Sequence, residues 1–296
     1  MKKAGLIGLG AMGAGIAATL RSKGYEMHVC DARPGAAIAF SEQGGVAWAN
    51  PAQVAAECEQ IVSVVVNAEQ TEAVLYGDKG AAAAMKPGSV FVMCSTVDPS
   101  RSIAFEERLD AAGIHYVDAP ISGGAAKAAS GQMTMMSSAK PAAYAKAGAL
   151  LDAMAAKVYR LGDRAGAGSK VKIINQLLAG VHIAAAAEAM ALGLREGVAP
   201  EALYDVITHS AGNSWMFENR MAHVLAGDYT PLSAVDIFVK DLGLVLDTAR
   251  ASKFPLPLAS TAHQMFMHAS SAGFAKEDDS AVIKIFPGIE LPAAAA

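Results

Sequence analysis

Short apolar runs alternate with helix-like segments through the first half of the chain. The run Ile61–Val66 is β-branched and shows no polar alternation, which is typical of a strand covered on both faces. Repeated alternation of this kind predicts a doubly wound parallel sheet. We expect strands at Ala4–Leu9, Met27–Asp31, Ile61–Val66, Val90–Cys94, His115–Asp118, Met133–Ser137 and Val158–Leu161. We expect helices between them that include Met12–Lys23, Pro51–Glu57, Gln70–Tyr76 and Ser100–Ala112.

The pattern changes after Gly162, because no strand-like β-branched run recurs beyond it. Long segments rich in alanine and leucine predict helices at Ser169–Glu196, Pro200–Ser210, Ser214–Ala226, Val235–Lys253 and Pro257–Ala272. We therefore expect two domains, residues 1–163 and residues 164–296. The first is α/β and the second is all-α, and a long helix joins them.

The first predicted strand ends in a glycine pattern that is typical of dinucleotide-binding turns. Its residues are Gly8, Leu9, Gly10, Ala11, Met12 and Gly13. Gly8 allows the tight turn, Gly10 lets the backbone approach the phosphates, and Gly13 lets the helix pack on its strand. The first amides of that helix then face the negative charge of the pyrophosphate. The pattern predicts that residues 1–163 form a Rossmann-type domain.

The second predicted strand ends in Asp31, 18 residues after Gly13. A carboxylate at this place accepts hydrogen bonds from the adenosine ribose and repels a 2′-phosphate. We therefore expect NAD as the cofactor, although the nearby Arg33 is a side chain that could bind the 2′-phosphate of NADP.

A secretory signal is the rival interpretation of the first 20 residues, where Met1-Lys2-Lys3 precedes a small, apolar stretch. Four glycines between Gly5 and Gly13 make a poor hydrophobic helix, and no small-x-small cleavage site precedes a polar segment. The strand–turn–helix interpretation also accounts for Asp31, so we favour it.

Composition narrows the class of protein. The net charge of −4 offers no basic surface for nucleic acid, and the 53% hydrophobic content is globular. Three widely spaced cysteines predict neither disulfides nor a zinc site, and they favour a reducing, cytoplasmic location. The apolar stretch Leu177–Leu194 carries His182 and Glu188, so we expect a core helix and no membrane segment.

We expect no bound metal. None of the seven histidines has a metal-ligand spacing. The acidic pair Asp278-Asp279 could ligate a cation, but it fits the start of a helix better, where negative charge is stabilised.

The carboxyl ends of parallel strands form the ligand edge of such a sheet. Asn67 follows the third predicted strand, and Thr96 lies just after the fourth. The fifth strand leads into Ser122-Gly123-Gly124, a turn with one hydroxyl and successive backbone amides that can converge on a carboxylate. A plain flexible loop is the alternative interpretation of this turn.

One lysine near the start of the long helix is unusual. Lys172 shares a helix side with Asn175 and Gln176, yet its sequence neighbours are apolar. A helical lysine is ordinarily solvated, but burial would lower the pKa of this amine because desolvation disfavours its charged form. A lysine that is neutral near pH 7 can remove a proton from an alcohol.

Four segments together resemble signatures of the β-hydroxyacid dehydrogenase family, which includes 3-hydroxyisobutyrate dehydrogenase and tartronate semialdehyde reductase. The segments are Gly8-Leu9-Gly10-Ala11-Met12-Gly13, Asp118-Ala119-Pro120-Ile121-Ser122-Gly123-Gly124, Gly166-x-Gly168-x-x-x-Lys172 and Lys240-Asp241-Leu242. They occur in the family's order and spacing and span nearly the whole chain.

The resemblance implies roles for substrate-binding residues. Lys172 would be the general acid and base, and Ser122, Gly123 and Gly124 would hold a substrate carboxylate. An amide would orient the substrate. Many relatives have asparagine four residues after the lysine, where this chain has Gln176, so either Asn175 or Gln176 could serve.

The resemblance also implies cofactor contacts from Val66, Asn67, Thr96 and Lys240. Thr96 would lie by the nicotinamide, and Lys240 would touch the cofactor near the reacting centre. The segment Val65-Val66-Asn67 departs from the Leu-Pro of many relatives, which alters loop stiffness more than chemistry.

We therefore expect NAD-dependent oxidation of a small polyhydroxy acid. The alternatives are oxidation of 3-hydroxyisobutyrate, reduction of tartronate semialdehyde, and a non-catalytic NAD-binding sensor. A sensor would need only the glycine turn, so Lys172 and Ser122 argue against it. Relatives pair through the helical domain, which implies a homodimer or homotetramer.

Overall fold

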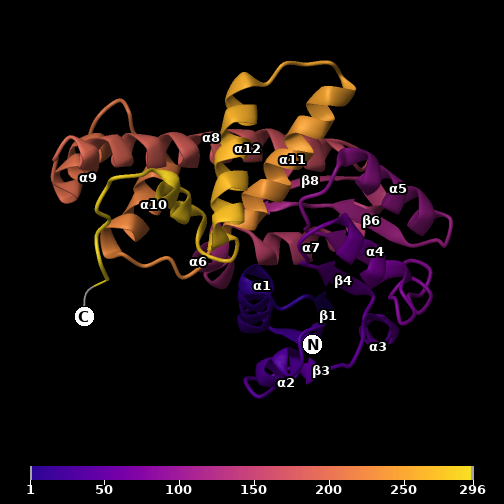
Figure 1. The fold of residues 1–296 in the computed structure, drawn as a ribbon. Helices are drawn as coiled ribbons and strands as arrows, with labels where there is room; N and C mark the ends of the chain where they lie inside the picture. Colours follow the sequence, from indigo (N-terminus) through magenta and orange to yellow (C-terminus); the bar gives the residue numbers. More distant parts are fainter. Residues whose placement is uncertain (1, 295–296) are drawn as a thin grey trace. The chain divides into compact units, whose positions relative to one another are not determined.

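The computed structural model describes residues 2–294, and its contacts divide the chain into two compact units between Lys172 and Ile173. Figure 1 follows the chain from the first unit to the second. The division falls inside the long helix α8 (Ala167–Arg195), because its first residues belong to one unit and the remainder to the other. The domain limits 1–163 and 164–296 stay a prediction.

Within residues 2–294, nine strands of the first unit form a sheet in the order β3-β2-β1-β4-β5-β6-β8-β7, with β9 beside β8. The strands are β1 (Lys2–Ile7), β2 (Tyr25–Cys30), β3 (Val46–Ala47), β4 (Gln60–Ser63), β5 (Val90–Met93), β6 (His115–Asp118), β7 (Ile121–Ser122), β8 (Thr134–Ala139) and β9 (Lys157–Arg160). The first six strands pair in parallel, in the order typical of dinucleotide-binding domains. This confirms the predicted Rossmann-type sheet.

All seven predicted strands are present, but two-residue strands β3 and β7 carry too little pattern to be predicted. The sheet also departs from a purely parallel one, since β8 runs antiparallel to β6 and to β7. Only β7 and a short helix lie between β6 and β8. Antiparallel pairing suits such a short connection, whereas a parallel pair needs a longer crossover.

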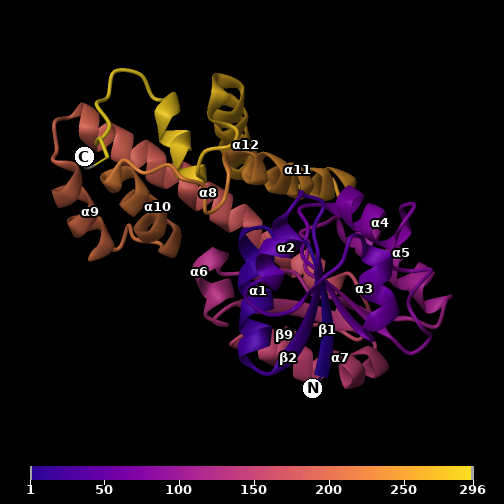
Figure 2. The same ribbon diagram turned by 90° about the horizontal axis from the view of Figure 1, so that it is seen from below.

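Helices cover both faces of this sheet, as Figure 2 shows. They are α1 (Ala11–Ser22), α2 (Ala36–Ser41), α3 (Pro51–Glu57), α4 (Ala68–Tyr76), α5 (Pro99–Asp110), α6 (Gly124–Ala129) and α7 (Pro141–Met154). One core layer includes Ile16 of α1 and Leu150 of α7. The opposite layer includes Val54 of α3, Leu75 of α4 and Phe105 of α5. The two layers bury both faces and leave the strand ends for ligands.

The second unit is helical, which confirms the predicted all-α fold. After α8 come α9 (Pro200–Thr208), α10 (Trp215–Ala226), α11 (Val235–Ala251), α12 (Pro257–Ala269), the π-helical turn η1 (Ser270–Phe274) and the 3-10 helix η2 (Asp279–Ile285). Its core gathers Ile183 and Met190 of α8 with Phe238 and Phe266. Among the described residues, α8 is the one helix long and apolar enough to cross a membrane, a test that core helices also pass.

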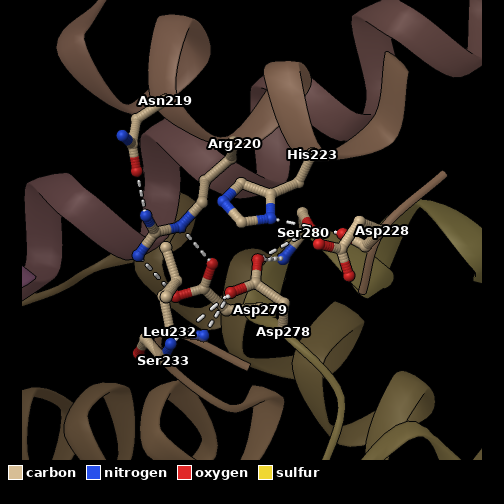
Figure 3. A network of polar contacts seen from close by, with 9 residues as sticks. All are labelled: Asn219, Arg220, His223, Asp228, Leu232, Ser233, Asp278, Asp279 and Ser280. Atoms are coloured by element: carbon tan, nitrogen blue, oxygen red, sulfur yellow. Dashed lines mark hydrogen bonds and ion pairs between the residues drawn. The ribbon is translucent and has the colours of Figure 1, made fainter. Parts of the chain in front are cut away.

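A buried polar network ties the loop before α11 to α10 and η2 (Figure 3). Asp279 is fully buried, and both of its carboxyl oxygens pair with the guanidinium of Arg220. Asp278 accepts hydrogen bonds from the backbone nitrogens of Leu232 (3.0 Å) and Ser280 (3.1 Å). The acidic pair therefore begins a helix, as the sequence indicated, and also anchors the loop that leads into α11.

Burial raises the pKa of the Asp279 carboxyl to about 6, although the neighbouring Arg220 acts in the opposite direction. At pH 8 the pair is therefore ionised and sealed from water. Removing one partner leaves an uncompensated buried charge, which is a costly arrangement.

The variant Asp279→Ala should lower the free energy of unfolding at pH 8 by about 3–5 kcal/mol, because it leaves Arg220 buried without its counter-ion. Urea denaturation measures this change. The matched control is Asp247→Ala, which breaks the exposed Asp247–Arg250 pair and should cost less than about 1 kcal/mol. Equal losses in the two variants would contradict a special role for the buried pair.

Candidate active site

The glycine turn between β1 and α1 has the shape that a dinucleotide pyrophosphate requires. Gly8 has φ of +96°, and a Cβ there would lie 2.3 Å from the carbonyl oxygen of Val64. A Cβ at Gly13 would lie 1.8 Å from the Gly8 oxygen, so the first turn of α1 packs tightly on the strand. Gly10 is exposed with open space around it, and it begins α1 without a side-chain cap. These residues fit a bound pyrophosphate.

Asp31 fastens this turn to the end of β2. Its Oδ2 accepts a hydrogen bond from the Leu9 backbone nitrogen at 2.5 Å, and its Oδ1 accepts from the Arg33 backbone nitrogen at 2.7 Å. Burial raises the pKa of the Asp31 carboxyl, but hydrogen bonds from Arg33 and Leu9 and the Arg33 charge outweigh it, so the net pKa is lowered. The group is ionised at neutral pH, as ribose recognition requires.

Arg33 folds back on the same carboxylate. Its Nε lies 3.0 Å from Asp31 Oδ1, and its Nη2 donates to the Leu9 carbonyl oxygen at 2.7 Å. The guanidinium is therefore engaged by Asp31, although the side chain is largely exposed. This pairing opposes the interpretation of Arg33 as a ligand for a 2′-phosphate.

The other predicted cofactor residues follow neighbouring parallel strands. Val66 and Asn67 lie after β4, and the half-buried Thr96 lies after β5. Asn67 caps α4 by accepting a hydrogen bond from the Gln70 nitrogen at 2.8 Å. Strands β1, β2, β4 and β5 are parallel neighbours, so their carboxyl ends share one edge of the sheet.

Ser122 ends β7, and two glycines with positive φ follow it. Gly123 has φ of +135° and Gly124 has φ of +76°. Successive backbones of this kind can turn their amides toward a common anion. Ser122 is half-buried and directly precedes these two glycines. The turn is chemically able to receive a carboxylate.

Asp118, to which no sequence pattern assigned a role, holds the start of α8. Asp118 is fully buried at the end of β6. Its Oδ2 accepts from the backbone nitrogens of Gly166 and Ser169, both at 2.9 Å, and its Oδ1 accepts from Ser169 Oγ at 2.7 Å. Ser138 Oγ donates to Oδ2 at 3.2 Å and accepts from the Gly168 nitrogen at 2.9 Å.

Burial raises the pKa of the Asp118 carboxyl, and the hydrogen bonds from Ser169 and Gly166 offset this effect only in part. Gly168 approaches the sheet so closely that a Cβ there would lie 2.4 Å from the Met136 oxygen. The first turn of α8 is thus fixed to the ends of β6 and β8. The sequence did offer one signal for Asp118. It ends a predicted strand and begins the family signature that was considered for Ser122, Gly123 and Gly124.

Lys172 follows in the next turn of α8 and is 6% exposed. The side chain is therefore largely removed from water. Lys170, two residues earlier, is exposed and has the ordinary environment of a helical lysine.

In the second unit, Asn175, Gln176 and Lys240 form one polar chain through Asp241. Gln176 Oε1 accepts from Asn175 Nδ2 at 3.1 Å, and Gln176 Nε2 donates to Asp241 Oδ2 at 2.6 Å. Lys240 Nζ lies 2.6 Å from Asp241 Oδ1. Sequence reasoning missed Asp241, although it stands beside Lys240 in a quoted signature. Among the described residues, no group of three or more His, Cys, Asp or Glu could hold a metal ion.

Comparisons with known proteins agree with this geometry. Residues 3–162 match the family model of the NAD binding domain of 6-phosphogluconate dehydrogenase. Residues 166–286 match the model described as NAD-binding of NADP-dependent 3-hydroxyisobutyrate dehydrogenase. The two matches together cover most of the chain and confirm the expected nicotinamide dinucleotide cofactor.

Similar proteins extend over nearly the full length. An L-threonate dehydrogenase of Cupriavidus necator is 66% identical over 288 residues, which cover 97% of each chain. An L-threonate dehydrogenase of Escherichia coli K12 is 52% identical over 98% of this chain and 96% of its own. A crystal structure of 3-hydroxyisobutyrate dehydrogenase from Salmonella typhimurium is 53% identical, with a TM-score of 0.92 over 97% of this chain and 100% of its own.

The variant Asp31→Asn should weaken discrimination against the 2′-phosphate, because it removes a negative charge and releases Arg33. We expect the wild type to bind NADH more tightly than NADPH. In Asp31→Asn, the dissociation constant for NADPH divided by that for NADH should be about tenfold smaller than in the wild type. Fluorescence titration of the reduced nucleotides measures both constants. Glu26→Gln, at the other end of β2, is the control and should leave the ratio unchanged. An unaltered ratio in Asp31→Asn would show that this carboxylate does not select the cofactor.

Proposed function

The chain belongs to the 3-hydroxyisobutyrate dehydrogenase family and is an NAD-dependent hydroxyacid dehydrogenase, and we propose that its substrate is L-threonate. The product would be 2-oxo-tetronate, formed by oxidation at carbon 2. The observation that carries this proposal is the 66% identity to an L-threonate dehydrogenase over 97% of both chains. The match extends over both compact units of the chain.

The polar chain of the second unit supports a hydroxyl-rich substrate. A site with buried amide and carboxylate groups binds an apolar analogue poorly, because that analogue would leave one of these protein groups without a hydrogen-bond partner. Asn175 and Gln176 lie in such a chain with Asp241. This environment favours L-threonate over the methyl-bearing 3-hydroxyisobutyrate.

Binding and orientation come first in the proposed mechanism. Ser122 and the amides of Gly123 and Gly124 hold the substrate carboxylate. The glycine turn Gly8–Gly13 and Asp31 bind the dinucleotide, with further contacts from Val66, Asn67, Thr96 and Lys240. Bound NAD⁺ supplies a hydride acceptor.

Proton transfer falls to Lys172. Its neutral amine takes the proton of the carbon 2 hydroxyl as that group is oxidised to a carbonyl, and the lysine becomes an ammonium. The hydride released from carbon 2 would go to the acceptor that bound NAD⁺ would supply. Burial favours this chemistry because it disfavours the charged amine before the reaction.

We also propose a homodimer or homotetramer in the cytoplasm. Helix α8 carries exposed apolar side chains at Ile174, Leu178 and Leu192, on positions spaced for one helix face. The three cysteines are free and buried, in keeping with a reducing compartment. A solution mass that is a multiple of the 30.3 kDa chain mass would support self-association.

A substrate panel tests the proposed function. Wild type should reduce NAD⁺ with L-threonate at a higher kcat/KM than with 3-hydroxyisobutyrate, followed by absorbance at 340 nm, and the signal should be weaker with NADP⁺. Reduction of tartronate semialdehyde is measured with NADH. A stronger preference for either alternative substrate would replace L-threonate, and nucleotide binding without turnover on any acid would favour the sensor.

The variant Lys172→Ala should lower kcat by about 10²- to 10⁴-fold, the usual contribution of a positioned acid–base group. The dissociation constant for NADH should stay near the wild-type value, which shows that the dinucleotide site is intact. Lys170→Ala is the matched control because that lysine is exposed on the same helix. Near-normal turnover in Lys172→Ala would remove this residue from the proton-transfer role.

A further inference from the structure

Helices α8 and α11 pack closely in the second unit. Gly180 of α8 meets Leu242 of α11, and a Cβ at Gly180 would lie 2.9 Å from the Leu242 Cδ1 atom. Gln176 lies one turn before Gly180 on the same helix face, and Asp241 adjoins Leu242. The close approach therefore fixes the register in which Gln176 and Asp241 meet.

Both members of this meeting are removed from water. Gln176 is 8% exposed and Asp241 is 1% exposed. Their hydrogen bond is 2.6 Å long, which is short for an amide donor and is typical of an ionised acceptor. A buried carboxylate needs such partners, and here they are an amide and the ammonium of Lys240.

The charge of Asp241 sets the direction of the amide chain. An ionised carboxylate only accepts hydrogen bonds, so Gln176 must turn its Nε2 toward Asp241. Its Oε1 then faces the other way and accepts from Asn175 Nδ2 at 3.1 Å. The Asn175 nitrogen therefore donates to Gln176, and the Asn175 carbonyl oxygen is the last atom of this series of hydrogen bonds. Both ends of the Gln176 amide are used within the protein.

The same carboxylate governs Lys240. The 2.6 Å contact between Lys240 Nζ and Asp241 Oδ1 holds the ammonium near one position and balances its charge. Lys240 is partly exposed, with 22% of its side chain accessible, so it combines a fixed charge with access for a ligand.

We propose that Asp241 is a positioning residue of the active site, which turns the Asn175 carbonyl oxygen toward a substrate hydroxyl beyond carbon 2 and holds the Lys240 ammonium for the cofactor. This inference rests on the proposed function for the roles of Asn175 and Lys240. It also separates the two amides: Asn175 contacts the substrate, and Gln176 transmits the orientation set by Asp241.

The first test compares L-threonate with 2-hydroxybutanoate of the same configuration at carbon 2, which lacks the other two hydroxyls. In Asp241→Asn and in Gln176→Met, the hydrogen bonds that orient the Asn175 amide are no longer fixed. At saturating NAD⁺, the kcat/KM for L-threonate should fall about tenfold further than that for 2-hydroxybutanoate, which is the fold-change expected for one hydrogen bond to a substrate hydroxyl. Asp247→Asn, exposed on the same helix, is the control and should alter neither value.

A purely structural role for Asp241 gives a different result, because misfolding or loosening of the protein would lower kcat/KM for both substrates by the same factor. Parallel losses would therefore overturn the proposal. A Gln176→Met variant that keeps the wild-type preference for L-threonate would also overturn it, because Gln176 would then not transmit the effect of Asp241 to Asn175.

A second measurement requires no substrate. The oxidised nicotinamide is cationic and the reduced ring is neutral, so an unbalanced Lys240 should disfavour NAD⁺ more than NADH. In Asp241→Asn, the ratio of the NAD⁺ to the NADH dissociation constant should rise by about 3- to 10-fold, and in Gln176→Met it should not change. Isothermal titration measures both constants.

The two measurements separate failure of this inference from failure of the proposed function. If wild type oxidises neither acid but the nucleotide ratio shifts as stated, the substrate is wrong and the role of Asp241 toward Lys240 stands. If wild type oxidises L-threonate and the ratio is unchanged in Asp241→Asn, the role of Asp241 is wrong and the function stands.

Discussion

The position of the proposed base Lys172 depends on one contact, between the carboxyl group of Asp118 and the first turn of α8. Four hydrogen bonds from Gly166, Ser169 and Ser138 converge on this one fully buried side chain. They satisfy the helix amides that have no partner within the helix, and they place a polar acceptor at its positive end. The turn that follows carries Lys172, so the position of the proposed base is set by the end of β6.

The second unit uses buried carboxylates in a similar manner. Asp241 directs an amide chain, and Asp278 and Asp279 anchor the loop that begins α11. Buried charge of this kind adds little net stability, because desolvation offsets much of the attraction. Its contribution here is geometric, since each carboxylate accepts from donors on two or more segments and leaves them one arrangement.

Much of the fold could be predicted from the sequence, because it rests on long, regular patterns. The run Ile61–Val66 and the other apolar runs identified every strand of four or more residues, and the alanine-rich segments identified the helices from α8 to α12. The two-residue strands β3 and β7 and the antiparallel direction of β8 were not predicted. Their pairing depends on how the chain turns between them, which no local pattern records.

Residues of the candidate site could be predicted at positions where only one physical requirement explains the residue type. Gly8 and Gly13 have no room for a side chain, and Asp31 follows a strand at the spacing that ribose recognition needs. Asp118 and Asp241 were missed because their function lies in partners that are distant in sequence. A carboxylate next to Lys240 or at the end of a strand has many ordinary interpretations, and only the fold shows which donors surround it.

Amide hydrogen exchange in Asp118→Ala tests most directly whether Asp118 holds the helix that bears the lysine. Amides in the first turn of α8 should exchange at least about tenfold faster than in wild type, while those of α1 do not change. Asp98→Ala, which removes the cap of α5, should leave exchange at the start of α8 unchanged. Wild-type exchange at the start of α8 in Asp118→Ala would contradict the account.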